Sequence, residues 1–584
     1  MKSFLVLGAG LLLHSAAQAQ GCANELLTHS SSGGVTDGHS TRASTSQDGR
    51  YVAFESSSTN LVPGDTNHWP DVFVVDRTNG AIERVSVSSS GAQAVLGGNE
   101  PSISADGRYV AFSSISDDLV AGDTNGARDI FVRDRNTSTT LRISLSNTGF
   151  ETDFASEAPV ISADGRFVAF QSYATNLVAS DKNGLLDVFV RDLQTNTNRW
   201  VSVSPQGPLV GSGGAEPAIS ADGRFVAFKS GVSSFGPLDT NNAADIYVLD
   251  TQTGIFDLVS SSSTDATSPG GANGPVLSAD GRYVAFAADA YLLVPNDLNN
   301  ASDVFVKDRV TRTCTRISTS SSGIEGNNTS LFPSISVDGR FVAFSSGANN
   351  LASGDSGNLE DVFLHDMQAG TTTWISIPVQ SGQTGASLRP SISGDGAVIA
   401  FESLSGQLAG NPWGGFEIYA RDCPFPTGTP YCSGIATACP CANGGAVNHG
   451  CANSAVSQGA SLEATGVASV TNDSVVLHVS GLPSPSTVLY FQGTNQLGGG
   501  GGTPYGDGLR CAGGTLIRLG TRSTSGGSGS FGAGVGSDPL ISLSGLIPPI
   551  GATRQYQAWY RDNATFCSAQ PFNFSNGYTI PWAP

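Results

Sequence analysis

Five copies of an Asp-x-Asn-x-x-x-Asp motif are the residues of this chain best suited to chemistry. Carboxylate and amide oxygens that alternate along a turn are the ligands that calcium takes in EF-hand-like loops. The motif lacks the downstream glutamate of such loops, and Asp and Asn also stabilise turns by bonding their own backbone. Calcium sites and structural turns are therefore both open interpretations. The members are Asp65, Asn67, Asp71, Asp123, Asn125, Asp129, Asp181, Asn183, Asp187, Asp239, Asn241, Asp245, Asp297, Asn299 and Asp303.

The motif recurs because most of the chain consists of seven copies of one segment. Each copy contains an Asp-Gly pair, and the pairs are spaced 58 residues apart five times and then 57. Such a period indicates a repeat fold, in which each unit buries its faces only against its neighbours. The sixth copy keeps Asp355 and Asp361 around Gly357, and the seventh keeps only Glu417. The pairs begin at Asp48, Asp106, Asp164, Asp222, Asp280, Asp338 and Asp395.

Each copy predicts four short strands, as the second copy illustrates. Asp106-Gly107 is a two-residue hairpin turn, because both residues tolerate the positive φ angles of such turns. Residues 109–112 are an unbroken apolar run, so both faces of the sheet must be covered. Four-stranded sheets stacked around an axis form a β-propeller, and the expected fold class is all-β with seven blades. The predicted strands of this copy cover residues 102–105, 108–113, 129–134 and 142–146.

The repeat resembles that of a known family. Ser-Ala-Asp-Gly-Arg-Tyr-Val-Ala-Phe at residues 104–112, followed by Asp-Ile-Phe-Val-Arg-Asp at 129–134, is similar to the TolB-type, WD-like β-propeller repeat. The resemblance covers residues 24–422, although the loops here are longer than is usual in that family. It implies a propeller, and it implies no single activity, because the family includes binding partners, sensors and domains attached to peptidases.

The N-terminal segment is predicted to close the ring. The seventh copy ends at residue 422 without a fourth strand, whereas residues 26–29 lie where a fourth strand should precede the first Asp-Gly pair. We expect residues 26–29 to complete blade seven and so to remove the open sheet edges. In repeat register, Cys22 and Cys423 flank the same tight turn, which predicts a disulfide between them. Two unrelated thiols are the alternative.

The connections between strands differ in length in the same way in every copy. The turns joining strands one to two and three to four are tight, and the other connections are long. In an up-and-down blade these two sets lie on opposite faces, here named the tight-turn face and the long-loop face. Because exposed loops on a rigid scaffold usually carry binding, we place the partner surface on the long-loop face.

An arginine follows the Asp-Gly pair in six copies. A ring of anion-binding sites is one interpretation. However, the second strand begins and the third ends on the tight-turn face, so each arginine is expected to pair with the aspartate that ends strand three, as a structural contact. The expected pairs are Arg50–Asp76, Arg108–Asp134, Arg166–Asp192, Arg224–Asp250, Arg282–Asp308 and Arg340–Asp366.

The composition predicts an extracytoplasmic protein. Lys2, the apolar residues 4–13 and the Ala-Gln-Ala of residues 17–19 predict a signal peptide over 1–19. Nine cysteines suit an oxidising compartment. No later apolar run is long enough to cross a bilayer, and a formal charge of −20 argues against nucleic-acid binding. We expect a monomer that is not membrane-spanning and lies in the periplasm, at the cell surface or outside the cell.

The composition changes after the propeller, which is expected over residues 20–423. Residues 424–460 are rich in Gly, Ala, Pro and Cys and predict a disulfide-containing linker. Residues 461–584 contain strand-like runs separated by turn signals and predict a smaller β-sandwich-like domain. Its phrases at 506–511 and 559–562 resemble a C-terminal module of secreted bacterial proteins. The pairing among Cys432, Cys439, Cys441, Cys451, Cys511 and Cys567 stays open, as does the role of Cys314.

No familiar catalytic constellation is present in the sequence. It contains no Gly-x-Ser-x-Gly elbow, no His-Glu-x-x-His and no phosphate loop. We therefore expect a non-catalytic propeller that binds a protein or glycan partner, with calcium as the one cofactor to consider. One alternative is a polysaccharide-acting hydrolase or lyase with paired carboxylates in the central channel. Another is a structural envelope component attached or sorted through its C-terminal module.

Overall fold

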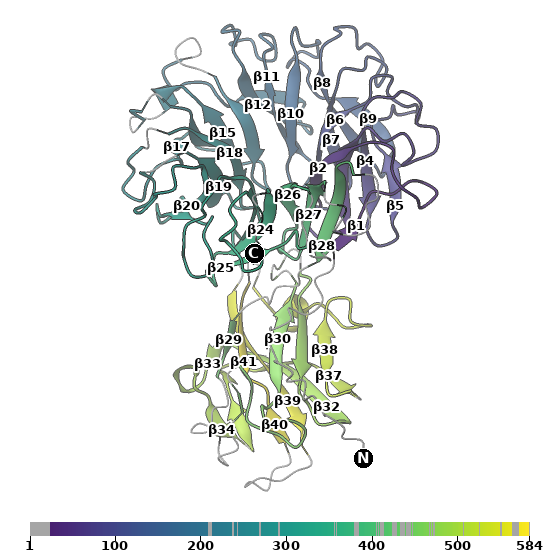
Figure 1. The fold of residues 1–584 in the computed structure, drawn as a ribbon. Helices are drawn as coiled ribbons and strands as arrows, with labels where there is room; N and C mark the ends of the chain where they lie inside the picture. The colour runs from purple at the N-terminus through teal and green to yellow at the C-terminus, as the bar shows by residue number, and fades with distance from the viewer. Residues whose placement is uncertain are drawn as a thin grey trace, which may run out of the picture.

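The chain folds into a propeller followed by a second β domain (Figure 1). The computed structural model describes residues 24–582 except 208–212, 236–238, 242, 268–269, 290–291, 356, 358, 379–384, 405, 407, 409–413, 423–428, 433–438, 440–444, 447, 467, 469, 471–472, 506, 525, 549–551 and 563–571. Seven four-stranded antiparallel sheets lie between residues 24 and 422, which confirms the seven-bladed propeller. The predicted signal peptide and the predicted Cys22–Cys423 disulfide lie outside the described residues.

In blades one to four the strands pair in chain order. Blade one contains β2 (Ser40–Thr45), β3 (Tyr51–Ser56), β4 (Asp71–Asp76) and β5 (Ala81–Arg84). Blade two contains β6 (Asn99–Ile103), β7 (Tyr109–Ser114), β8 (Asp129–Asp134) and β9 (Thr139–Arg142). Blade three contains β10 (Ser156–Ile161), β11 (Phe167–Ser172), β12 (Asp187–Asp192) and β13 (Thr197–Trp200). Blade four contains β14 (Ala215–Ile219), β15 (Phe225–Ser230), β16 (Asp245–Asp250) and β17 (Phe256–Leu258), with the short helix η1 (Ser233–Phe235) in a loop.

Blades five and six follow the same order, and blade seven draws its outer strand from the N-terminus. Blade five contains β18 (Ala272–Leu277), β19 (Tyr283–Ala288), β20 (Asp303–Asp308) and β21 (Cys314–Arg316). Blade six contains β22 (Ser330–Ile335), β23 (Phe341–Ser346), β24 (Asp361–Asp366) and β25 (Thr371–Trp374). Blade seven contains β26 (Ser387–Ile392), β27 (Val398–Ser403), β28 (Glu417–Asp422) and β1 (Asn24–Leu26).

The N-terminal strand closes the ring, as predicted. Asn24 pairs with Arg421 and Leu26 with Tyr419, and the Leu27 N–H continues the ladder to the Ile418 carbonyl at 2.9 Å. The strand therefore begins two residues earlier than the predicted 26–29. Thr28 no longer pairs as a strand residue, and its hydroxyl donates to the Glu417 carboxylate instead.

A closed ring of seven backbone hydrogen bonds links the residues that precede the Asp-Gly turns. Each N–H donates to the equivalent carbonyl of the next blade at 2.8–3.1 Å, and the Gly394 N–H completes the circle to the Gln47 carbonyl. Equivalent residues meet because the repeat places the same turn at the same height in every blade. The donors are Gln47, Ala105, Ala163, Ala221, Ala279, Val337 and Gly394.

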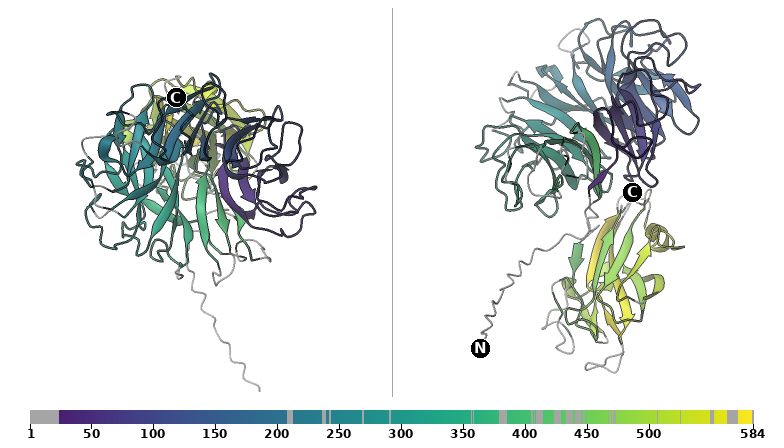
Figure 2. Two further views of the ribbon diagram at one scale, coloured as in Figure 1. Left: turned by 90° about the horizontal axis from the view of Figure 1, so that it is seen from above. Right: turned by 45° about the vertical axis from the view of Figure 1, so that its right-hand side comes forward.

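The blades bury both faces, as their apolar runs predict. The middle residues of the second and third strands are fully buried, and the rings of paired aromatic residues such as Phe112 and Phe131 stack 5.7 Å apart. The first strands of neighbouring blades lie side by side around the centre of the ring (Figure 2). Cys314 lies buried in blade five as a free thiol, and burial raises its pKa to about 12, which makes it unreactive.

The second domain is a β-sandwich. One sheet has the order β29 (Thr429–Tyr431), β41 (Gly577–Trp582), β39 (Ala552–Arg561), β32 (Ser486–Gly493) and β37 (Ile517–Thr524), with β40 (Phe572–Phe574) beside β39. The other contains β30 (Ser461–Thr465), β31 (Val476–Ser480) and β38 (Gly529–Gly532). Two further two-stranded sheets pair β33 (Asn495–Gln496) with β36 (Ala512–Gly513) and β34 (Thr503–Tyr505) with β35 (Gly508–Arg510). The helices η2 (Gly498–Gly500) and α1 (Ile541–Ser544) are short.

Described residues within the segment 424–460, which was predicted as a linker, contact this domain. Strand β29 pairs with β41 near the end of the chain. Disulfides join Cys432 to Cys511 and Cys439 to Cys451. The composition of this segment did not predict the pairing of β29 with β41. A three-residue strand shows no hydrophobic period, and its partner lies about 150 residues away in the sequence. None of the described helices is long and apolar enough to span a membrane.

Candidate functional site

The Asp/Asn motif lies on the long-loop face, where it enters the third strand of each blade. In blade two, Asp123 and Asn125 belong to the loop and Asp129 is the first residue of β8. The Asn125 amide nitrogen donates to the Asp129 carboxylate at 3.1 Å, and its oxygen accepts the Ala127 N–H at 2.9 Å. Asn67, Asn183 and Asn299 bond in the same way. These asparagines therefore act as turn residues, and each amide oxygen accepts a backbone N–H.

In blade two a guanidinium lies among the carboxylates. Arg142, the last residue of β9, places its Nη1 2.7 Å from Asp123 and 3.5 Å from Asp129. The same nitrogen is 2.8 Å from Glu151, which comes from the loop leading into blade three. Arg142 and both aspartates are buried. The long-loop face thus contains a group of three carboxylates around one cation, here named the ion cage. In blade two this cation is the guanidinium of Arg142.

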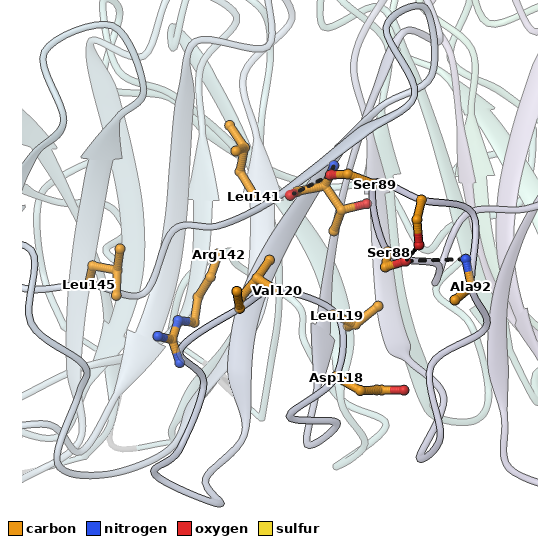
Figure 3. Close-up of a pocket in the computed structure, with 12 residues that line it drawn as sticks. Ser88, Ser89, Ala92, Asp118, Leu119, Val120, Leu141, Arg142 and Leu145 are labelled. Atoms are coloured by element: carbon orange, nitrogen blue, oxygen red, sulfur yellow. Dashed lines mark hydrogen bonds between the residues drawn. The ribbon is translucent and has the colours of Figure 1, made fainter.

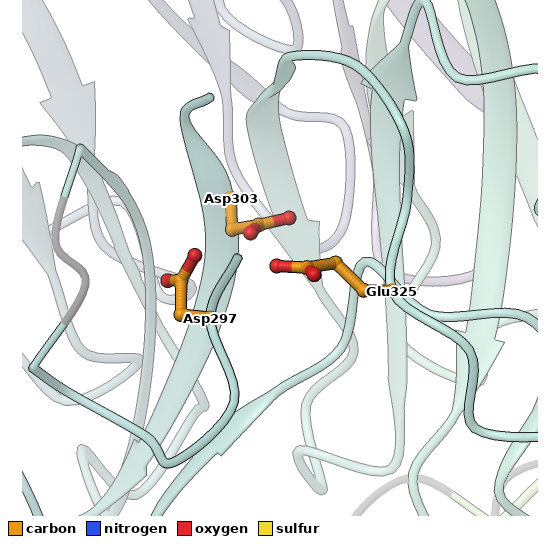
Figure 4. A group of neighbouring side chains, drawn as sticks. All are labelled: Asp297, Asp303 and Glu325. Atoms are coloured by element: carbon orange, nitrogen blue, oxygen red, sulfur yellow. The ribbon is translucent and has the colours of Figure 1, made fainter. Parts of the chain in front are cut away.

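Blade five contains the same ion cage, and blade one contains a variant of it. In blade five, carboxylate oxygens of Asp297, Asp303 and Glu325 lie within 4.8 Å of one another (Figure 4), and Arg316 Nη1 is 2.6 Å from Glu325. The same nitrogen is 3.6 Å from Asp297 and 3.5 Å from Asp303. This group has the composition of a metal site, but the Arg316 guanidinium already contacts all three carboxylates.

Blade one replaces the glutamate by an amide. Arg84 Nη1 lies 3.3 Å from Asp65 and 3.5 Å from Asp71. The Gln93 amide donates to the same two carboxylates at 2.8 and 3.0 Å. Blade one therefore has one carboxylate fewer than blades two and five, and the Gln93 amide takes the place of the third carboxylate.

Burial and charge act in opposite directions on these carboxyl groups. Burial raises the pKa of Asp123 to about 6, with the neighbouring Asp129 adding to the effect, and burial also raises that of Asp303 to about 6. The more exposed Glu151 has its pKa lowered to about 2 by hydrogen bonds from Thr124 and from Arg142. The charged form of the buried aspartates therefore depends more on the neighbouring guanidinium than the charged form of Glu151 does.

These arginines lie outside the Asp/Asn motif and were not predicted as site residues. Arg84 and Arg142 are separated by one period of 58 residues, and Arg316 follows three periods after Arg142. The period alone was a sufficient signal. The period does not give the register of strands three and four. In the structure Arg142, at the end of strand four, pairs with Phe131 near the start of strand three, which brings the arginine to the aspartates.

Other blades carry different residues at the arginine position, namely Trp200, Leu258 and Trp374. In blade three, the Trp200 indole N–H donates to Asp187 at 2.8 Å, beside Ser202 at 2.6 Å. The second oxygen of Asp187 accepts the Asn183 amide at 2.9 Å. Neutral donors thus satisfy the Asp187 carboxylate that a guanidinium contacts elsewhere. The calcium interpretation of the motif remains a prediction. The blades differ in whether an arginine or a neutral donor contacts the aspartates of the motif.

The arginines after the Asp-Gly turns form the structural pairs expected. Arg108 donates through Nε and Nη2 to both oxygens of Asp134, at 3.0 and 2.7 Å, and its guanidinium stacks on the Tyr109 ring. The same ring lies beneath the turn of the next blade, where a Cβ on Gly165 would meet it at 2.2 Å. The pair, the ring and the glycine together explain why the Asp-Gly-Arg-Tyr/Phe phrase recurs. Equivalent pairs form at Arg50, Arg166, Arg224, Arg282 and Arg340.

Four glutamates on the first and second strands of the blades pair with basic residues. Arg42 bridges Glu55 and Glu100 at 3.3 and 3.2 Å, and the Arg42 N–H donates to Glu402 at 2.9 Å. Glu402 also pairs with Arg389 at 3.2 Å, and Glu216 pairs with Lys229 at 3.0 Å. Each of these carboxylates contacts a basic side chain, so none presents the unpaired acid and base that a glycosidase mechanism uses.

Most exposed large apolar side chains of the propeller lie in the long connections. Trp69, Phe150, Phe154 and Tyr173 are each about half exposed or more, with Phe150 at 72%. A cleft of about 690 Å³ opens between the loops of blades one and two (Figure 3). It has Ser88 and Ser89 on one side and Leu141 and Arg142 on the other. The other such residues of the long connections are Val35, Val95, Ile115, Leu185, Leu292, Leu298, Ile324, Leu359 and Ile377.

Together, these features define a seven-bladed β-propeller with an ion cage and exposed aromatic residues on one face. The chain is 17% identical to a protein described as TolB from Agrobacterium tumefaciens, over 60% of this chain and 96% of that chain, with a TM-score of 0.33. It is 14% identical to TolB from Acinetobacter baumannii, over 65% and 78%, with a TM-score of 0.31. The propeller domain of the Trilobed protease from Pyrococcus furiosus is 12% identical, over 66% and 94%, with a TM-score of 0.41.

TolB proteins are the family that the repeat motif resembles. At these identities and TM-scores the likenesses carry no assignment of activity. No protein-family model matches the chain, and a search of curated proteins finds no match. The function therefore has to be argued from the surface of this molecule.

Proposed function

We propose that this chain is an exported protein whose propeller binds a protein or glycan partner through the long-loop face. The observation that carries the proposal is the group of exposed aromatic side chains on blades one to three, Trp69, Phe150, Phe154 and Tyr173. Aromatic residues supply large contact areas at low entropic cost, and they are enriched where proteins bind partners. Such side chains on a surface loop have no role in the core of the blades.

Two further observations support this proposal. Strand β28 ends at the tight-turn face, and the second domain follows on that side of the ring (Figure 1). The long-loop face therefore stays open to a partner. Two disulfides in the second domain suit an oxidising compartment, in agreement with the signal peptide that the sequence predicts.

Binding by the purified full chain to a glycan array and to cell-envelope extracts tests the proposal. The triple variant Trp69→Ser, Phe150→Ser, Phe154→Ser should lose at least about tenfold in affinity, since each removes an aromatic contact worth about 1 kcal/mol or more at an interface. The matched control is Leu292→Ser, Leu298→Ser, Ile324→Ser, which removes exposed apolar residues from the opposite arc. Equal loss in both variants, or in neither, would place the partner surface elsewhere.

A further inference from the structure

Blade four differs from its neighbours in how its buried aspartates are neutralised. Asp239 lies in the loop and Asp245 begins β16, at the positions of Asp123 and Asp129 in blade two. Asp239 is 7% exposed and Asp245 only 1%. The residue at the arginine position is Leu258, and among the described residues no basic side chain lies within ion-pair distance of either carboxylate.

One oxygen of this pair lacks a hydrogen bond. Ser260 donates to Asp245 Oδ1 at 2.5 Å, but Asp245 Oδ2 is buried and accepts no hydrogen bond of ordinary geometry from the described residues. The Asn241 amide is near enough to lower the pKa of Asp245, yet burial raises it to about 6. Asp239 accepts the Tyr247 hydroxyl and, at 3.3 Å, the Asn241 N–H. A buried charge with this little compensation is costly.

The other blades show what such a pair binds. In blades one, two and five the two equivalent carboxylates hold a cation, the guanidinium of Arg84, Arg142 or Arg316. In blade three the Trp200 indole and the Asn183 amide satisfy the second aspartate. Blade four has neither the guanidinium nor the indole, because the residue at that position is Leu258, whose side chain is short and apolar.

We infer that Asp239 and Asp245 of blade four bind a divalent cation of the calcium class. Carboxylate oxygens with a hydroxyl nearby are ligands for a hard cation, and a monoatomic ion needs less space than a guanidinium. Thr267 stands where blades two and five have Glu151 and Glu325, so this site has two carboxylates instead of three. Low ligand charge predicts weak binding, about 10⁻⁴–10⁻³ M, as in extracellular calcium modules. The inference does not depend on the proposed partner.

Terbium luminescence and thermal melting of the full chain test the site. Terbium(III) replaces calcium and is sensitised by a nearby phenol, and the Tyr247 hydroxyl contacts Asp239 directly. After chelation, terbium should give luminescence that calcium displaces, and calcium should raise the melting temperature. Tyr247→Phe, the residue found at this position in blades one to three, five and six, should lose most of the luminescence and keep the calcium-dependent melting shift.

Two variants and one control make the test specific. Asp245→Asn should weaken calcium binding at least about tenfold. Leu258→Arg installs the guanidinium of the sister blades and should abolish the calcium effect in a folded protein. The control Asp187→Asn removes the equivalent aspartate of blade three and should leave calcium binding unchanged. No calcium-dependent shift in the wild-type protein, or the same shift in Asp245→Asn and Leu258→Arg, would overturn the inference and indicate a pair that shares a proton.

Discussion

The two faces of the propeller use charged residues in opposite ways. On the tight-turn face, each arginine after an Asp-Gly turn pairs with an aspartate of its own blade near the surface, as Arg108 does with Asp134. On the long-loop face, Arg142 is 7% exposed and holds together carboxylates from three segments of chain. The first arrangement is repeated in six blades, whereas the second is present in some blades and replaced in others.

The difference shows which face is constrained by the ring itself. In blades two to seven the Asp-Gly turn lies on an aromatic ring of the blade before it, and in blade one it lies on Val398, so a change there disturbs a contact between blades. Among the described residues, the Asp/Asn motif and the exposed aromatic residues of the long loops lie under no ring that recurs from blade to blade. The residues of the long loops are free to differ, and this freedom explains both the variable cation and the exposed aromatic side chains.

Replacing the buried arginine should have the largest effect. Arg142→Met leaves Asp123, Asp129 and Glu151 without their shared cation, and breaking a buried ion group by removing one partner costs about 3–5 kcal/mol. Urea unfolding should show this loss as a lower midpoint. Arg108→Met is the matched control on the tight-turn face, where the pair is more exposed, and its midpoint should change little. Equal losses would break the comparison between the faces.

Replacing a turn glycine should have the next largest effect. Gly107 has a φ of +71°, and a Cβ there would lie 2.2 Å from the Tyr51 ring. Gly107→Ala therefore combines left-handed strain of about 1–2 kcal/mol with overpacking of about 1–3 kcal/mol. Gly122 has a φ of +81° with open space around it, so Gly122→Ala should show the strain alone. The difference between the two unfolding free energies measures the contact between blades.

The pH dependence of stability should also separate the faces. Hydrogen bonds from Arg108 and Arg166 lower the pKa of Asp134 and Asp192 to about 2. Their contribution is complete above pH 4 and is lost only as the pH falls through about 2. Burial raises the pKa of Asp181, on the long-loop face of blade three, to about 6.

The Asp181 carboxyl favours its protonated form in the folded state, so its contribution is present below about pH 4 and is lost as the pH rises through about 6. With chelator present, the melting temperature should therefore rise from pH 7 to pH 5. Asp181→Asn should rise less over the same range. An identical rise in both proteins would show that Asp181 is not the group responsible.

The smallest effect on stability is expected from the exposed aromatic residues. Trp69→Ser and Phe154→Ser change side chains that are about half exposed, and surface substitutions usually change stability by about 0.5 kcal/mol or less. Thermal melting should show little change even when partner binding is lost. A large loss of stability would mean that these side chains support the loops rather than meet a partner.

The repeat allowed much of the propeller to be predicted. Arg108 and Asp134 were expected to pair because strand two begins where strand three ends, and the structure confirms that contact. The closing strand was expected at residues 26–29 and begins at Asn24. The offset arose because the repeat register fixes the position of a strand only to within a few residues, whereas its hydrogen bonds to β28 fix each residue.

By itself, the sequence determined the number of blades, the face on which the loops gather and the structural arginine pairs. These properties follow from one period, since every copy must repeat the contacts of the next. Only the tertiary structure decided that Glu151 meets Arg142, that Trp200 meets Asp187 and that Cys432 bonds to Cys511. The period repeats such residues but does not show which of them meet, and the second domain has no period, so in each case only the folded backbone brings the two partners together.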